Sequence, residues 1–159
     1  MLNTLVYPEF SQAVKDFIHA CRTPGLSEEL TSPKGLESIM RKGLTDPGRL
    51  SAETLAAFLA PFDAPEARRA LAQAGIGTEL KGYPAIVLGL KKFAGPVRIV
   101  YGERDPHLPE VAETMARVKA DLPQAEVTAL PECGHFLQLE APEVVGGMLE
   151  RFFGEVTSR

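Results

Sequence analysis

The last third of the chain alternates two segments typical of β-strands with two typical of helices. Residues 97–101 (VRIVY) and 126–130 (EVTAL) are rich in β-branched and apolar residues, whereas residues 109–122 and 142–153 carry apolar side chains at helical spacing. Strands separated by a helix pair in parallel, because a parallel neighbour requires a crossover connection. The sequence therefore predicts a β-α-β-α unit with a parallel sheet.

The preceding residues, from position 7 to about 92, are interrupted by Pro and Gly and are otherwise helical in period. Four helices are predicted from first-turn prolines, capping residues and a terminal glycine. They run from Pro8 to about Cys21, from Ser32 to Gly43, from Ser51 to Pro61 and from Asp63 to Ala74, with Gly75 as the stop of the last. Residues 2–6 (LNTLV) have the pattern of a further strand. The fold class is predicted to be α/β with a long helical insert.

Composition is that of an ordinary globular protein. The 159 residues fit one domain, and 45% of them are hydrophobic. A net charge of −4 and the scarcity of basic clusters argue against nucleic-acid binding. The sequence has no signal-peptide pattern and no apolar run long enough to span a membrane, so we expect a soluble, cytoplasmic protein. Cys21 and Cys133 are too few for a disulfide framework and are expected to be reduced thiols.

Two ionisable residues occupy corresponding places after the two late strands. Asp105 lies in the loop GERDP after the first, and His135 lies in the loop PECGHF after the second. The C-terminal ends of parallel strands share one edge of a sheet, where ligands bind, so the two side chains are expected to meet. A carboxylate that accepts the imidazole N–H fixes the histidine tautomer and leaves the other ring nitrogen to act as a general base. Either residue alone is more often a turn, capping or loop residue, but their joint occurrence favours an acid–base pair.

The same loops offer little for a metal ion or a second nucleophile. Cys133 and His135 are two candidate ligands, whereas a structural zinc site needs four, so no metal or cofactor is predicted. Cys133 is expected to be a small buried thiol rather than a nucleophile. His19 and His107 are expected at the surface or at an interface.

Residues 96–153 resemble the last third of the α/β-hydrolase superfamily, as in epoxide hydrolases, haloalkane dehalogenases and related esterases. In that family a strand ending in G-x-x-D-x-x-x-P carries the acid, and a loop G-H-x-x-x-x-E-x-P carries the histidine. The matching residues are Gly102, Asp105 and Pro109 for the first motif and Gly134, His135, Glu140 and Pro142 for the second. More loosely, residues 60–62 (APF) and 65–68 (PEAR) resemble the cap domain of dehalogenase-like members.

The resemblance implies a partial α/β-hydrolase fold, with about three parallel strands, helices and a helical cap. Residues 1–6 would be a remnant strand of the core, residues 7–92 the cap (lid) and a return helix, and residues 93–159 the C-terminal part of the core. Asp105 and His135 would be the catalytic pair, acting on a small, fairly apolar substrate such as an ester, epoxide or haloalkane. Phe62, Leu108 and Phe136 are the candidate substrate-binding side chains, although each taken singly is more often a core residue.

The sequence departs from the family at the nucleophile. The family carries it upstream of the cap on an elbow, G-x-S-x-G or a variant with Asp, and no such motif occurs here. The loop that supplies the oxyanion hole, also expected upstream, is missing as well. Three hypotheses follow. The first is a hydrolase whose histidine activates water or a nucleophile that these residues do not include. The second is a truncated or split, inactive fragment that forms a homodimer or pairs with a complementing N-terminal half, and the third is a binding protein without catalysis. Retention of Asp105 and His135 argues against the last.

Overall fold

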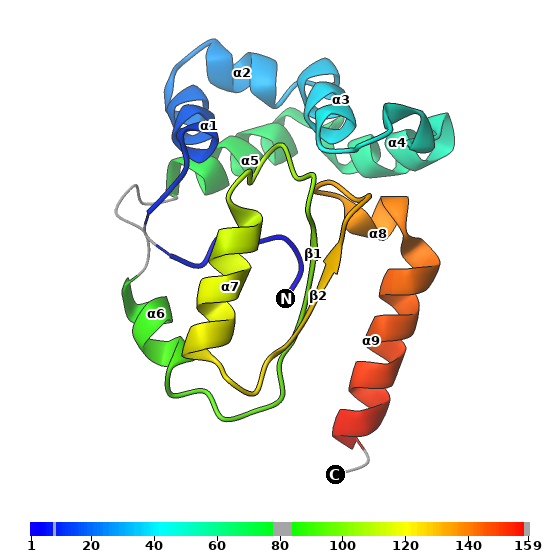
Figure 1. The fold of residues 1–159 in the computed structure, drawn as a ribbon. Helices are drawn as coiled ribbons and strands as arrows, with labels where there is room; N and C mark the ends of the chain where they lie inside the picture. Colours follow the sequence, from blue (N-terminus) through cyan, green and yellow to red (C-terminus); the bar gives the residue numbers. More distant parts are fainter. Residues whose placement is uncertain (8, 78–83, 158–159) are drawn as a thin grey trace.

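The computed structural model describes residues 1–7, 9–77 and 84–157, which form helices around a small parallel sheet (Figure 1). The strands are β1 (Arg98–Gly102) and β2 (Glu126–Leu130). The helices are α1 (Gln12–Arg22), α2 (Leu26–Leu30), α3 (Pro33–Lys42), η1 (Pro47–Arg49), α4 (Ala52–Leu59), η2 (Ala60–Phe62), α5 (Pro65–Gly77), α6 (Pro84–Leu90), α7 (Val111–Asp121), α8 (Leu137–Glu140) and α9 (Pro142–Thr157). Helices α1 to α5 lie over the end of the sheet at which both strands end (Figure 1).

The two strands pair in parallel and in register over their whole length. Helix α7 makes the crossover and packs on one face of the sheet, and α9 packs on the other (Figure 1). Successive residues of β1 serve the two faces: Ile99 packs with α7 and Val100 with α9, and they are 0% and 1% exposed. The predicted β-α-β-α unit is thus confirmed. Within the described ranges, no helix combines the length and the apolar character that crossing a membrane requires.

The segment 2–6 forms a single bridge in place of the predicted strand. Leu2 pairs in parallel with Val100 on the edge of β1 opposite β2. The next N–H on this edge, that of Gly102, would reach the backbone carbonyl of Asn3 in a regular parallel ladder. It donates instead to the side-chain oxygen of Asn3, at 3.0 Å. The ladder ends here because the side-chain amide takes the place of the backbone group.

Capping hydroxyls set the starts of the insert helices. The N-caps predicted at Ser32 and Ser51 are confirmed, because each hydroxyl accepts a hydrogen bond at 3.0 Å from the first turn of its helix. The first helix begins later than predicted: α1 starts at Gln12 and is capped by Ser11. Pro8, the predicted start, lies outside the described residues. A hydroxyl that satisfies a first-turn N–H is therefore the stronger start signal here.

Gly75 does not end α5, so the predicted helix stop is wrong. The helix continues to Gly77, and Gly75 lies where α5 packs against α1. A Cβ atom at Gly75 would lie 2.4 Å from Sγ of Cys21, which is only 3% exposed. A glycine is needed here because the two helices pack closely at this position. It does not form a left-handed helix cap.

Gly75→Ala is accordingly expected to destabilise the chain by about 1–3 kcal/mol, the usual cost of overpacking a core. The matched control is Gly146→Ala within α9, where an added Cβ would meet nothing within 4 Å. The control is expected to stabilise the chain by about 0.5–1 kcal/mol, because alanine favours the helix. Urea unfolding followed by circular dichroism measures both, and equal effects would contradict the packing role.

Candidate active site

The loops that follow β1 and β2 meet at one edge of the sheet and bring Asp105 and His135 together. Oδ2 of Asp105 and Nδ1 of His135 are 2.8 Å apart. At this distance Nδ1 carries the hydrogen and donates it to the carboxylate. The other ring nitrogen, Nε2, has no hydrogen-bond partner among the residues that the structure describes. The histidine side chain is 26% exposed, whereas that of the aspartate is 0% exposed.

The Asp105 carboxylate is fully hydrogen-bonded. Oδ1 accepts from the backbone N–H groups of His107, at 2.8 Å, and Leu108, at 3.0 Å. Oδ2 accepts from the amide of Asn3 at 2.7 Å, in addition to His135. Burial by itself would raise the pKa of Asp105, but the hydrogen bond and charge of His135, together with the two backbone N–H groups, hold that pKa below its ordinary value. The side chain is therefore an ionised acceptor at neutral pH.

A second buried carboxylate, Glu140, holds the histidine loop. Glu140 is 5% exposed, and its Oε2 accepts from the backbone N–H of Gly134 at 2.6 Å. Its Oε1 accepts from the backbone N–H of Thr45, at 2.7 Å, and from the hydroxyl of the same residue. The backbone N–H of His135 in turn donates to the carbonyl of Gly43 at 2.7 Å. Glu140 thus ties the loop to the residues that follow α3.

Gly102 allows the two loops to lie against each other. A Cβ atom at this position would lie 2.3 Å from the carbonyl oxygen of Gly134 and 2.4 Å from that of Cys133. These are backbone atoms, so they cannot turn aside as a flexible side chain can. Any side chain at position 102 would therefore clash with the histidine loop, which explains why the acid-bearing motif begins with glycine in this chain.

An apolar cavity of about 340 Å³ lies beside His135. Its lining comes from the N-terminal segment, from α1 and α3 and from the two loops: Leu5, Ala13, Val14, Phe17, Ile39, His107, Leu108, His135 and Phe136. Two of the three candidate substrate-binding residues, Leu108 and Phe136, are in this lining. Phe62 is not among the described residues of the lining; it belongs to η2, where its carbonyl accepts from Arg68 at 2.7 Å.

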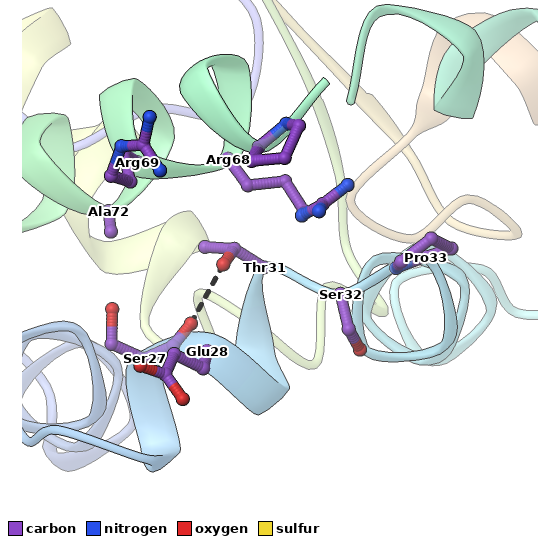
Figure 2. Close-up of a pocket in the computed structure, with 9 residues that line it drawn as sticks. Ser27, Glu28, Thr31, Ser32, Pro33, Arg68, Arg69 and Ala72 are labelled. Atoms are coloured by element: carbon purple, nitrogen blue, oxygen red, sulfur yellow. Dashed lines mark hydrogen bonds between the residues drawn. The ribbon is translucent and has the colours of Figure 1, made fainter. Parts of the chain in front are cut away.

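A larger cavity, of about 610 Å³, lies between α2, α3 and α5, and Figure 2 shows its polar lining. Several of its polar groups are engaged with the protein itself. The Thr31 hydroxyl donates to the carbonyl of Ser27 at 2.9 Å, Arg68 donates to two backbone carbonyls, and Arg69 pairs with a glutamate of its own helix. Asp105 and His135 lie outside this lining, so the apolar cavity is the candidate active site.

His107 lies inside the site, where the sequence indicated a surface or interface. Its ring is edge-on to that of His135, with centroids 5.0 Å apart, and its Nε2 is 3.0 Å from the carbonyl oxygen of Ile39. Burial lowers the pKa of His107, the Ile39 hydrogen bond opposes this, and the charge of His135 lowers it further. The neutral ring therefore donates from Nε2 to α3. Spacing gave no signal for this contact, because the two residues are 68 positions apart.

Cys133 is buried, and burial, followed by the charge of Glu140, raises the pKa of its thiol. A protonated thiol is a poor nucleophile, in agreement with the expected role as a small buried side chain. In the described part of the chain, no three His, Cys, Asp or Glu side chains are grouped so that they could hold a metal ion.

The chain matches a known protein family along most of its length. The family described as "Alpha/beta hydrolase family" matches residues 9–146. A parallel β-α-β-α core with an acid and a histidine at its C-terminal edge is the arrangement that the resemblance implied. The chain belongs to the alpha/beta hydrolase family, and the partial form of that fold is confirmed. No curated protein sequence matches the chain significantly.

Several solved structures share the fold. A haloalkane dehalogenase, DbeA, from Bradyrhizobium elkani USDA94 is 20% identical, with a TM-score of 0.74 and coverage of 99% of this chain and 57% of that one. A thermophilic esterase from Thermogutta terrifontis is 20% identical, with a TM-score of 0.67 and coverage of 98% and 54%. A serine hydrolase from Cycloclasticus zankles is 20% identical, with a TM-score of 0.69 and coverage of 94% and 52%. The chain spans between 52% and 57% of the length of these three proteins.

Glu140→Gln is expected to lower the free energy of unfolding by about 1.5–3 kcal/mol, because one oxygen that accepts a backbone N–H becomes an NH₂ group. The matched control is Glu143→Gln, an exposed glutamate in the first turn of α9. This control is expected to cost only about 0.3–1 kcal/mol through the helix dipole. Urea unfolding measures both. A cost for Glu140→Gln no larger than that of the control would contradict the clamp.

The Asp105 carboxylate is expected to make the free energy of unfolding depend on pH. Because its pKa is lowered in the folded chain, its stabilising contribution is present at neutral pH and is lost as pH falls through the folded pKa. Asp105→Asn should cost about 1–3 kcal/mol near pH 7, and the difference from wild type should shrink below about pH 4. Urea unfolding across this range tests it, with exposed Asp16→Asn as the control. A constant difference at every pH would count against the linkage.

Proposed function

We propose that this chain carries the acid and the general base of a hydrolase active site. The observation that carries the proposal is the 2.8 Å contact between Nδ1 of His135 and the buried carboxylate of Asp105, beside an apolar cavity. Asp105 selects the tautomer with the hydrogen on Nδ1 and stabilises the imidazolium that forms. His135 accepts a proton at Nε2, on the side of the ring that is free of the carboxylate.

In this proposal the nucleophile comes from a polypeptide segment other than these residues. The described serines sit in helices or cap them, as Ser11, Ser32 and Ser51 do. His135 suits either family chemistry. It removes the proton of a serine hydroxyl that forms an acyl ester, or that of the water that hydrolyses an aspartyl alkyl ester. The nucleophile therefore separates an esterase from a dehalogenase or an epoxide hydrolase.

The cavity supports a small, fairly apolar substrate. Its volume of about 340 Å³ lies at the low end for ligand sites, and most of its lining side chains are hydrocarbon. Leu108 and Phe136 would contact the substrate next to His135. The helices of residues 7–92 would act as the lid. Two of the similar proteins are named as a haloalkane dehalogenase and an esterase, which supports haloalkanes and esters as candidate substrates. Epoxides are a candidate through the family resemblance alone.

Association with a second polypeptide is part of the proposal. Residues 1–3 already occupy the outer edge of β1: the N-terminal amine donates to the carbonyl of Arg98, and the N–H groups of Val100 and Gly102 donate to Met1 and Asn3. Among the described residues, this short segment has no strand on its own far side, where a further strand could add. On α9, the apolar side chains of Val144, Leu149 and Phe153 are 47%, 37% and 58% exposed. Exposed apolar surface of this kind favours a partner. A complementing N-terminal half would bury the exposed apolar residues and would also supply the nucleophile. A second copy of this chain would only bury the apolar residues.

The alternative function is an inactive fragment that associates or binds ligand. The exposed apolar residues of α9 fit it equally well. What separates the two functions is whether His135 is used in turnover, since packing and ligand binding need no general base.

The experiment expresses the chain together with the polypeptide encoded immediately upstream of Met1. We expect that polypeptide to contain G-x-S-x-G or its Asp variant, to co-elute with the chain and to confer hydrolysis of p-nitrophenyl butyrate, styrene oxide or bromobutane. His135→Ala should then reduce kcat about 10²–10⁴-fold, the usual contribution of a general base. Absence of an upstream elbow, or full activity in His135→Ala, would overturn the proposal.

The controls use the 159-residue chain alone. His19→Ala removes an exposed imidazole and reports the background hydrolysis that any surface histidine gives. Wild type, His19→Ala and His135→Ala should all show only background without the complementing segment. Turnover by the chain alone that is lost only in His135→Ala would refute the assignment of the nucleophile to another segment.

A further inference from the structure

We propose that Asn3 is a positioning residue of the acid–base pair, because its buried amide bonds the Asp105 carboxylate, the carbonyl that precedes His135 and the end of β1 at once. The inference rests on the proposed function, in which Asp105 and His135 act as an acid and a general base. Its test reads the state of the histidine ring directly and requires no turnover. The sequence pattern indicates only that Asn3 belongs to a strand.

The amide of Asn3 has a unique orientation. Nδ2 donates to Oδ2 of Asp105 at 2.7 Å and to the carbonyl oxygen of Gly134 at 3.1 Å. Oδ1 accepts from the backbone N–H of Gly102 at 3.0 Å. Exchanging the amide oxygen and nitrogen would set an oxygen against two acceptors and an NH₂ group against a donor. The residue is 9% exposed, so water does not replace these partners readily.

The contact with Asp105 falls on the oxygen that also bonds the histidine. Oδ2 accepts from Asn3 on one side and from Nδ1 of His135 on the other, while Oδ1 is held by two backbone N–H groups. Rotation of the carboxylate would break bonds at both oxygens. The second bond of Nδ2, to Gly134, fixes the loop immediately before His135. One side chain therefore sets the acid and the base relative to each other.

The chemical consequence concerns the tautomer of His135. A neutral imidazole can act as a base at Nε2 only when its hydrogen is on Nδ1, and a fixed acceptor beside Nδ1 favours that tautomer over the other. Without the Asn3 amide, Oδ2 loses a donor and the loop loses an anchor. The ring is then expected to populate both tautomers. Besides the carboxyl itself, the titratable group bonded to this oxygen is the ring of His135, and the ring of His107 lies edge-on to that ring.

The test is ¹⁵N NMR of the three histidine side chains, recorded in alkaline solution where the rings are neutral. Single substitutions of the histidines assign each signal to its residue. In wild type we expect the His135 signals of a single tautomer, with Nδ1 protonated. In Asn3→Ala the two signals should move toward each other. Thr31→Val is the matched control, because it removes a buried hydrogen bond, to Ser27, away from this site. An unchanged tautomer in Asn3→Ala, or an equal change in Thr31→Val, would overturn the proposal.

Asn3→Asp provides a second readout in an isosteric side chain. It replaces the donor to Oδ2 by a carboxylate, so two carboxylates face each other and share a proton. The folded variant then binds more protons than its unfolded chain, and its stability rises as pH falls. We expect its deficit in urea midpoint relative to wild type to be largest near pH 8 and to shrink toward about pH 5. A deficit that is constant or grows on acidification would show that residue 3 does not act on Asp105.

Discussion

The parallel pairing of β1 with β2 is the constraint on which the site depends. The strands end opposite each other, at Gly102 and Leu130. The ladder continues past them, since the backbone N–H groups of Glu103 and Arg104 donate to the carbonyls of Leu130 and Cys133 at 3.1 and 3.0 Å. The two loops are therefore bonded to each other before either reaches its functional residue. A slip of one residue would exchange the two faces of the sheet and separate the loops.

The site is also constrained by two buried carboxylates, which are costly to bury without partners. Asp105 is satisfied by the N-terminal segment, its own loop and the histidine loop. Glu140 is satisfied by the histidine loop and by Thr45, in the helical insert. Each carboxylate thus joins parts of the chain that are far apart in sequence. The geometry beside the cavity can form only when the N-terminal segment, the insert and the core are all in place.

The secondary structure of the core was largely predictable because its signals are local. The β-branched runs became β1 and β2, and the serine caps at Ser32 and Ser51 began the expected helices. The errors came where a distant contact decides the local outcome. Glycine is the residue type that commonly ends a helix, yet the role of Gly75 is set by the thiol of Cys21 across the helix interface. The expected first strand is reduced to one bridge because the side chain of Asn3 takes a backbone position in the ladder.

The sequence by itself determined the family, the order of the core elements and the two loops that carry Asp105 and His135, because motif spacing and strand composition are properties of neighbouring residues. Tertiary structure alone decided that the two side chains lie 2.8 Å apart, that His107 borders the same cavity and that Phe62 is not among the described residues of its lining. It also decided that Asn3 bonds the acid. The physical reason is that hydrogen bonds between residues 30 to 102 positions apart leave no periodic or compositional trace. They form only when folding has brought these segments together.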